Sequence, residues 1–153
     1  MTSNSEKIIA VIPAHNEGKT VEAVVAGLKP YVFEVVVVDD KSSDNTSEAA
    51  TKGGAIVIRH EQNSGYDKTI NDGFAEAARL GATIVFSFDA DGEHAAEDVP
   101  NILAPILEGR ADMVAGQRPF TTHWAEKFFA LYTRARYGLR DPLCGFKAYR
   151  REV

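Results

Sequence analysis

The chain alternates short apolar runs with segments in which apolar residues recur at helical spacing. A continuous apolar run predicts a buried strand, because a strand covered on both faces shows no polar alternation. Five such strands are predicted, over residues 8–12, 35–38, 55–58, 83–88 and 113–115. Apolar residues three and four positions apart predict amphipathic helices between these strands. The helices are expected over residues 19–28, 44–50, 70–78 and 102–107.

Strands that alternate with helices predict an α/β fold with a mostly parallel central sheet. The chain has 153 residues, which is about the length of one domain, so a single domain over residues 1–153 is expected. Ligands of such sheets bind beyond the carboxyl ends of the strands. Polar residues that directly follow a predicted strand are therefore the first candidates for a functional site.

Four of the predicted strands are followed by a polar cluster. The clusters occupy residues 15–17, 39–40, 89–91 and 117–118. The carboxyl ends of parallel strands lie at the same edge of a sheet, so the four clusters are expected to meet there.

Composition narrows the class of protein. Apolar residues make up 44% and charged residues 25% of the chain, as in ordinary soluble domains, and no segment approaches the ~20 apolar residues of a membrane span. The net charge of −5 argues against nucleic-acid binding, and the single cysteine excludes a disulfide within the chain and fits a reducing compartment. No G-K-[ST] follows Gly65 and no G-x-G-x-x-G occurs, which argues against P-loop ATPases and dinucleotide-binding oxidoreductases.

The pair Asp89 and Asp91 is the strongest chemical signal. Two carboxylates one residue apart repel each other unless a cation lies beside them. Oxygen ligands favour Mg²⁺ or Mn²⁺ over zinc, and Glu93 and His94 follow closely enough to complete the ligand set. The alternative is a solvated turn in which the aspartates only cap the backbone.

Asp39 and Asp40 form a second acidic pair after a strand. A carboxylate in this place accepts hydrogen bonds from a base N–H or from ribose hydroxyls in other nucleotide-binding folds. The alternative is that the pair caps the turn into the next helix together with residues 42–44. The connection over residues 13–17 reaches the same edge. Asn16 is also a candidate cap of the following helix, with Glu17 favouring the helix dipole, and both interpretations can hold at once.

Basic residues concentrate in the C-terminal third of this acidic chain. Guanidinium groups bind phosphates through paired contacts, and Arg118 and Lys147 are the predicted phosphate ligands. A solvated or membrane-facing surface explains the other basic residues equally well. His60, His123 and Cys144 have no evident partner in the sequence and are assigned to structure or surface.

Five segments in order resemble the inverting family-two glycosyltransferases, which have the GT-A fold. Within that family the chain is most similar to the dolichol-phosphate mannose synthase and polyprenyl-phosphate glycosyltransferase branch. The resemblance implies a three-layer α/β/α domain. The segments are IPAHNEG from residue 12, VVVDDKSSDNT from 36, NSGYDKTINDG from 63, FDADGEH from 88 and DPLCGFKAYRREV from 141.

The resemblance also implies roles for single residues. Asp89, Asp91 and Glu93 would hold a divalent metal, Mg²⁺ or Mn²⁺, at the donor diphosphate, with Glu93 standing where the branch often has Gln. Asp141 would be a candidate base for the acceptor, although an acceptor phosphate needs none because it is already an anion. The nucleotide-sugar contacts would be Pro13, Ala14, Asn16, Glu17, Asp39, Asp40, Gly65, Asp89, Arg118 and Lys147.

The expected activity is inverting transfer of a hexose from a UDP- or GDP-linked sugar. The first expected acceptor is a polyprenyl phosphate and the second a saccharide, in the cytoplasm or at the inner face of the membrane with at most peripheral contact. A nucleotidyltransferase acting on a sugar phosphate is one alternative, but such enzymes usually carry a glycine-rich basic loop where this chain has AHNEG. A non-catalytic nucleotide-binding module is the other. Relatives usually continue with further helices, so the chain is expected to be either a minimal enzyme or a truncated one.

Overall fold

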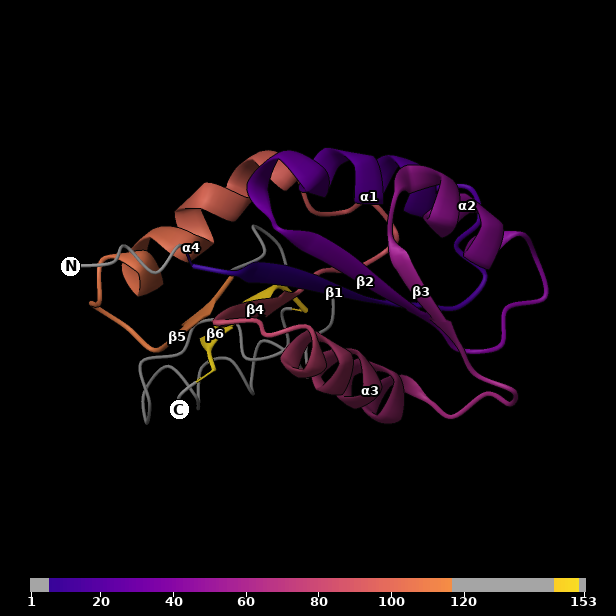
Figure 1. Cartoon of the computed structure of the whole chain (residues 1–153). Coiled ribbons are helices and arrows are strands. Elements are labelled where there is room, and N and C mark those ends of the chain that lie inside the picture. The colour runs from indigo at the N-terminus through magenta and orange to yellow at the C-terminus, as the bar shows by residue number, and fades with distance from the viewer. Residues whose placement is uncertain (1–5, 117–144, 152–153) are drawn as a thin grey trace, which may run out of the picture.

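A single six-stranded sheet organises the chain in a computed structural model that describes residues 6–116 and 145–151 (Figure 1). The strand order is β3-β2-β1-β4-β6-β5. Strands β1 to β4 pair in parallel, and β6 is antiparallel to both of its neighbours, β4 and β5. The predicted α/β class with a mostly parallel sheet is confirmed. The strands are β1 Ile8–Ala14, β2 Glu34–Asp39, β3 Ile56–Arg59, β4 Ile84–Ser87, β5 Met113–Ala115 and β6 Lys147–Arg150.

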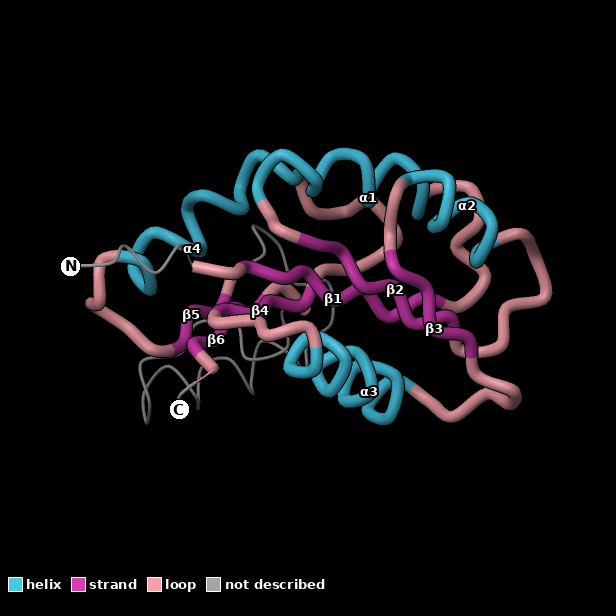
Figure 2. The backbone as a smooth tube through the Cα atoms, in the orientation of Figure 1, coloured by secondary structure: helices cyan, strands magenta, loops and turns pink. Residues whose placement is uncertain are grey.

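Helices cover both faces of the sheet and complete the three layers (Figure 2). Among the helices of residues 6–116 and 145–151, three lie on one face and one, α3, lies on the other. Among residues 6–116 and 145–151, no helix is long and apolar enough to cross a membrane. The helices are α1 Val21–Leu28, α2 Thr46–Gly53, α3 Tyr66–Arg79 and α4 Val99–Leu107, with short 3₁₀ turns at Lys29–Tyr31 and Ala96–Asp98.

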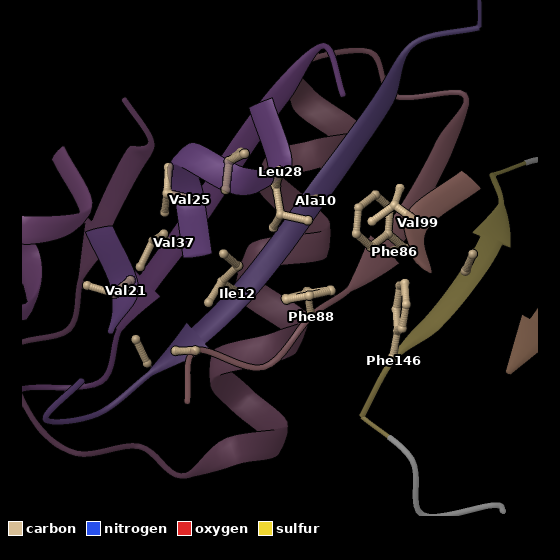
Figure 3. Packing of buried hydrophobic residues seen from close by; sticks show 14 of the residues in the cluster. Ala10, Ile12, Val21, Val25, Leu28, Val37, Phe86, Phe88, Val99 and Phe146 are labelled. Atoms are coloured by element: carbon tan, nitrogen blue, oxygen red, sulfur yellow. The ribbon is translucent and has the colours of Figure 1, made fainter. Parts of the chain in front are cut away.

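The core divides into two clusters because successive side chains of a strand point to opposite faces. In β1, Ala10 and Ile12 pack with the layer of α1, α2 and α4, whereas Ile9 and Val11 pack under α3. Figure 3 shows the first cluster, in which the rings of Phe86 in β4 and of Phe88 just after it extend the aliphatic core toward Phe146. Both faces of β1 and β2 are thus buried, which explains why the sequence shows continuous apolar runs there.

The sequence did not predict β6, and it placed the start of α3 too late. Only Ala148 of the four residues in β6 is fully buried, and the strand forms because it fits between β4 and β5. Helix α3 begins at Tyr66, because Gly65 adopts a φ of 83° that ends the preceding loop. Its first turn carries few apolar residues, so the helical spacing was visible only from Ile70 onward.

Helix α3 touches the sheet at Gly73, where a side chain has no room. A Cβ on this residue would lie 2.2 Å from Val11 Cγ1 and 3.2 Å from Val38 Cγ2. We expect Gly73→Ala to lower the free energy of unfolding by about 1–3 kcal/mol, because overpacking outweighs the ~1 kcal/mol that alanine adds to helix propensity. Urea unfolding measures this change.

The control for that measurement is Asn71→Ala on the exposed side of the same helix. This control should change stability by no more than about 0.5 kcal/mol. A Gly73→Ala protein as stable as the control would show that the helix shifts freely on the sheet.

Candidate functional site

Two buried carboxylates end strand β2, and the first of them, Asp39, has no exposed surface. Its Oδ1 accepts a hydrogen bond from the Ser42 amide at 2.7 Å. Its Oδ2 accepts from the Ser47 hydroxyl and from Arg59 Nη1, the latter at 3.2 Å. Asp39 therefore holds the β2–α2 loop in place, as the capping interpretation of the sequence described.

Asp40, which is 5% exposed, holds a different loop. Its Oδ1 accepts from the Ser64 amide at 2.7 Å and lies 2.8 Å from His60 Nδ1, while its Oδ2 accepts from the Gly65 amide at 2.9 Å. The other ring nitrogen of His60 lies 3.0 Å from Asp72 Oδ2. The sequence assigned His60 to structure or surface, and no local pattern revealed these partners.

Hydrogen bonds fasten the β1–α1 loop to the β2–α2 loop. The Asn16 amide donates to Ser42 Oγ and the Glu17 amide donates to Thr46 Oγ1, both at 2.9 Å. Asn16 Oδ1 accepts from the Ser43 amide at 2.8 Å, so this side chain bridges two loops and does not cap α1. The three loops after β1, β2 and β3 consequently form one connected edge.

A cavity of about 280 Å³ opens at this edge. It gathers four of the predicted nucleotide ligands, whereas Asn16, Glu17 and Asp39 are not among its lining residues. The sequence treated Asp39 and Asp40 alike, and the structure distinguishes them, since only Asp40 reaches the cavity. The lining residues are Pro13, Ala14, His15, Asp40, Asn63, Gly65, Tyr66 and Thr69.

The second acidic pair follows β4. Burial raises the pKa of Asp89, the nearby His94 lowers it, and the charges of Asp91 and Glu93 raise it further. His94 Nε2 lies 3.5 Å from Asp89 Oδ2, and Asp91 Oδ1 accepts from the Glu93 amide at 2.9 Å. Gly145 covers the other side, where a Cβ would lie 2.3 Å from Asp89 Oδ2.

The donor chemistry of this acidic turn fits a hard divalent cation. The negative charges of Asp91 and Glu93 act on Asp89, and oxygen donors are the ligands of Mg²⁺ and Mn²⁺. Within the described ranges, no three His, Cys, Asp or Glu side chains are grouped closely enough to form a complete metal site. The predicted ligand set Asp89, Asp91 and Glu93 is therefore a pair of carboxylates with a third nearby, and the other ligands of a bound metal would come from elsewhere.

A second cavity, of about 300 Å³, adjoins the acidic turn at the carboxyl end of β5. His94, Asp98 and Asn101 line it together with Gly116 and Phe146. Sequence reasoning missed Asp98 and Asn101. The signal was their three-residue spacing at the start of a helix, which brings both to one side.

Of the remaining predicted ligands, one lies in β6 and two lie outside the described residues. Lys147 begins β6 and pairs with Ser87, the last residue of β4, so its backbone lies at the same edge as Asp89. Arg118 and Asp141 fall outside the described residues.

Comparison with known proteins identifies the family. A family model described as "Glycosyl transferase family 2" matches residues 9–153. The chain therefore belongs to glycosyl transferase family 2. This finding confirms the resemblance inferred from the five segments.

Two curated relatives carry lipid-phosphate names. The chain is 33% identical, over an alignment of 129 positions, to the UDP-N-acetylglucosamine–dolichyl-phosphate N-acetylglucosaminyltransferase of Methanococcus voltae, covering 72% of this chain and 51% of the relative. It is 30% identical, over an alignment of 169 positions, to the dolichol-phosphate mannosyltransferase of Pyrococcus furiosus, covering 96% of this chain and 47% of the relative. The chain thus spans about half the length of these two relatives.

A solved structure shares the fold. Glucosyl-3-phosphoglycerate synthase from Mycobacterium tuberculosis, in complex with Mn²⁺, UDP-glucose and phosphoglyceric acid, matches with a TM-score of 0.81 and 25% identity. The match covers 97% of this chain and 58% of that one. The GT-A fold implied by the resemblance is confirmed.

The buried carboxyls of Asp39 and Asp40 make the stability of the fold depend on pH. Burial alone would raise the pKa of Asp39 and of Asp40, but hydrogen bonds outweigh it and hold both below the usual range. A carboxyl with a depressed folded-state pKa stabilises the fold above its unfolded pKa, near 3.9, and this stabilisation is lost as the pH falls through the lower folded value. The free energy of unfolding should therefore fall steeply below about pH 4.

Urea unfolding at a series of pH values measures this loss. Asp39→Asn should lower stability at neutral pH and flatten the acid limb, because one of the depressed carboxyls is gone. Asp112→Asn, at an exposed position, should leave the curve unchanged. If stability falls as steeply with acid in Asp39→Asn as in the parent, the pH dependence comes from other carboxyls.

Proposed function

We propose that the chain is the donor-binding domain of a metal-dependent glycosyltransferase that uses a nucleoside-diphosphate sugar. The observation that carries this proposal is the placement of Asp40 in a cavity at the same sheet edge as Asp89. Strands β2 and β4 flank β1, so their ends lie about 10 Å apart at ordinary strand spacing. A base in the cavity can then extend its diphosphate toward the acidic turn.

The Asp40 cavity and the acidic turn after β4 have different roles in this proposal. Asp40 accepts a hydrogen bond from the base, and the wall at Pro13 and Gly65 surrounds it. Asp89 and Asp91 hold Mg²⁺ or Mn²⁺, which neutralises the departing diphosphate when bound. Lys147 and Arg118 contact phosphate, and their positive charges stabilise the negative charge that develops on the leaving group.

The acceptor attacks the anomeric carbon from the face opposite the leaving diphosphate, which gives inversion. A polyprenyl phosphate is the first acceptor, because two similar relatives are named for dolichol or dolichyl phosphate. A saccharide or another hydroxyl compound is the second, and for that acceptor Asp141 is the proposed base. Membership of the family favours glycosyl transfer over nucleotidyl transfer.

Calorimetric titration of UDP and of GDP, with and without Mn²⁺, tests the donor site. We expect at least one of the two to bind, and Mn²⁺ to tighten that binding. Asp91→Asn should weaken the Mn²⁺-dependent part by about tenfold or more, since a ligating carboxylate is lost. Glu97→Gln, at an exposed residue outside both cavities, is the matched loss of one negative charge and should bind as the parent does. Metal-independent binding, or none, contradicts the proposal.

Gly145 offers a second test, because it touches Asp89 without contributing a donor. In Gly145→Ala the new methyl group would overlap the carboxylate, whose atoms lie 2.3–2.7 Å from the place that the methyl carbon would take. We expect a several-fold loss of Mn²⁺-dependent nucleotide affinity at nearly unchanged metal-free affinity. The comparison of those two affinities separates displacement of Asp89 from a general loss of folding, which would reduce both together.

A further inference from the structure

Hydrogen-bond partners occupy most of the acceptor positions of the Asp40 carboxylate. An ionised carboxylate offers about four lone-pair positions, two on each oxygen. The Ser64 amide and His60 Nδ1 occupy Oδ1, at 2.7 and 2.8 Å, and the Gly65 amide occupies one position of Oδ2 at 2.9 Å. Among the contacts of the described residues, one acceptor position is left, and it belongs to Oδ2.

The ring of His60 has a partner at each of its two nitrogens. A carboxylate only accepts hydrogen bonds, so Nδ1 is the donor in the hydrogen bond with Asp40. The opposite nitrogen, Nε2, lies 3.0 Å from Asp72 Oδ2, and Lys68 Nζ lies 2.7 Å from the same oxygen. With 11% of its side chain exposed, the ring has little freedom to turn away from Asp40.

We propose that His60 is a specificity-determining residue that makes the cavity select uracil over guanine. Uracil presents a single N–H, at N3, which one remaining acceptor position can satisfy. Guanine presents N1–H and the N2 amino group side by side, and this pair needs an acceptor on each carboxylate oxygen. By occupying Oδ1, His60 removes the second acceptor. The inference rests on the proposed function, namely that the Asp40 cavity holds the base of a nucleoside diphosphate.

The consequence for guanine is a donor left without a partner in a partly enclosed cavity. An unpaired buried donor weakens binding by about tenfold or more. His60 does not touch the base in this account, and it acts only through the carboxylate that it occupies. The ratio of UDP to GDP affinity is therefore the quantity that depends on His60, whereas a purely structural histidine would change both affinities together.

Three substitutions distinguish these roles. In His60→Asn the side-chain amide nitrogen takes the place of Nδ1 and keeps the bond to Asp40. In His60→Gln it takes the place of Nε2, reaches toward Asp72 and frees Oδ1, and His60→Ala frees Oδ1 entirely. The control is Arg59→Gln at the neighbouring position, the last residue of β3, which removes a partner of Asp39 and should lower only the melting temperature.

Calorimetric titration of UDP and GDP in the presence of Mn²⁺ measures the ratio for each protein. We expect the parent and His60→Asn to prefer UDP by about tenfold or more, and the ratio to fall toward one in His60→Gln and His60→Ala. Equal binding of UDP and GDP by the parent, or an unchanged preference in both His60→Gln and His60→Ala, overturns the inference and leaves the proposed function standing. Failure of the parent to bind either nucleotide overturns the proposed function itself.

Discussion

Two buried carboxylates at the end of β2 organise the edge of the sheet on which the proposed site depends. Buried charges are stable only when donors surround them, and here the donors come from different loops. Asp39 draws in the β2–α2 loop through Ser42, and Asp40 draws in the loop before α3 through Ser64 and Gly65. The β1–α1 loop joins them where His15 Nδ1 lies 2.8 Å from the Asp40 carbonyl oxygen. These hydrogen bonds join the three loops before any ligand arrives, which would reduce the entropy lost when the proposed nucleotide binds.

The acidic turn after β4 has the opposite character. Asp89 and Asp91 repel each other, and His94 Nε2 lies 3.5 Å from Asp89 Oδ2. This repulsion between carboxylates destabilises the protein on its own, and a bound cation relieves it. The acidic turn and the loops around Asp40 therefore differ in what they require from a ligand. Gly145 connects this turn to β6, because its lack of a side chain lets the antiparallel strand approach Asp89.

The sequence predicted the sheet well and the individual contacts poorly, for physical reasons. Strands buried on both faces produce apolar runs, and loops after parallel strands share an edge, so the fold class and the common edge of these loops could be predicted. The difference between Asp39 and Asp40 was not, because adjacent side chains diverge and their partners depend on tertiary folding. The sequence showed no partner for His60, because its partners lie 20 and 12 positions away. Strand β6 was missed because its stability comes from pairing with two neighbours and not from its own residues.

Paramagnetic broadening of amide NMR signals by Mn²⁺, recorded in the presence of UDP, tests the central claim most directly. The account predicts that the amides of Asp91, Gly92 and Gly145 broaden first, because the metal lies at the acidic turn. It also predicts that UDP shifts the amide signals of Ser64 and Gly65, whose partner is Asp40. Broadening centred on another part of the fold, or UDP shifts that spare the loop before α3, would contradict a nucleotide-diphosphate site at this edge.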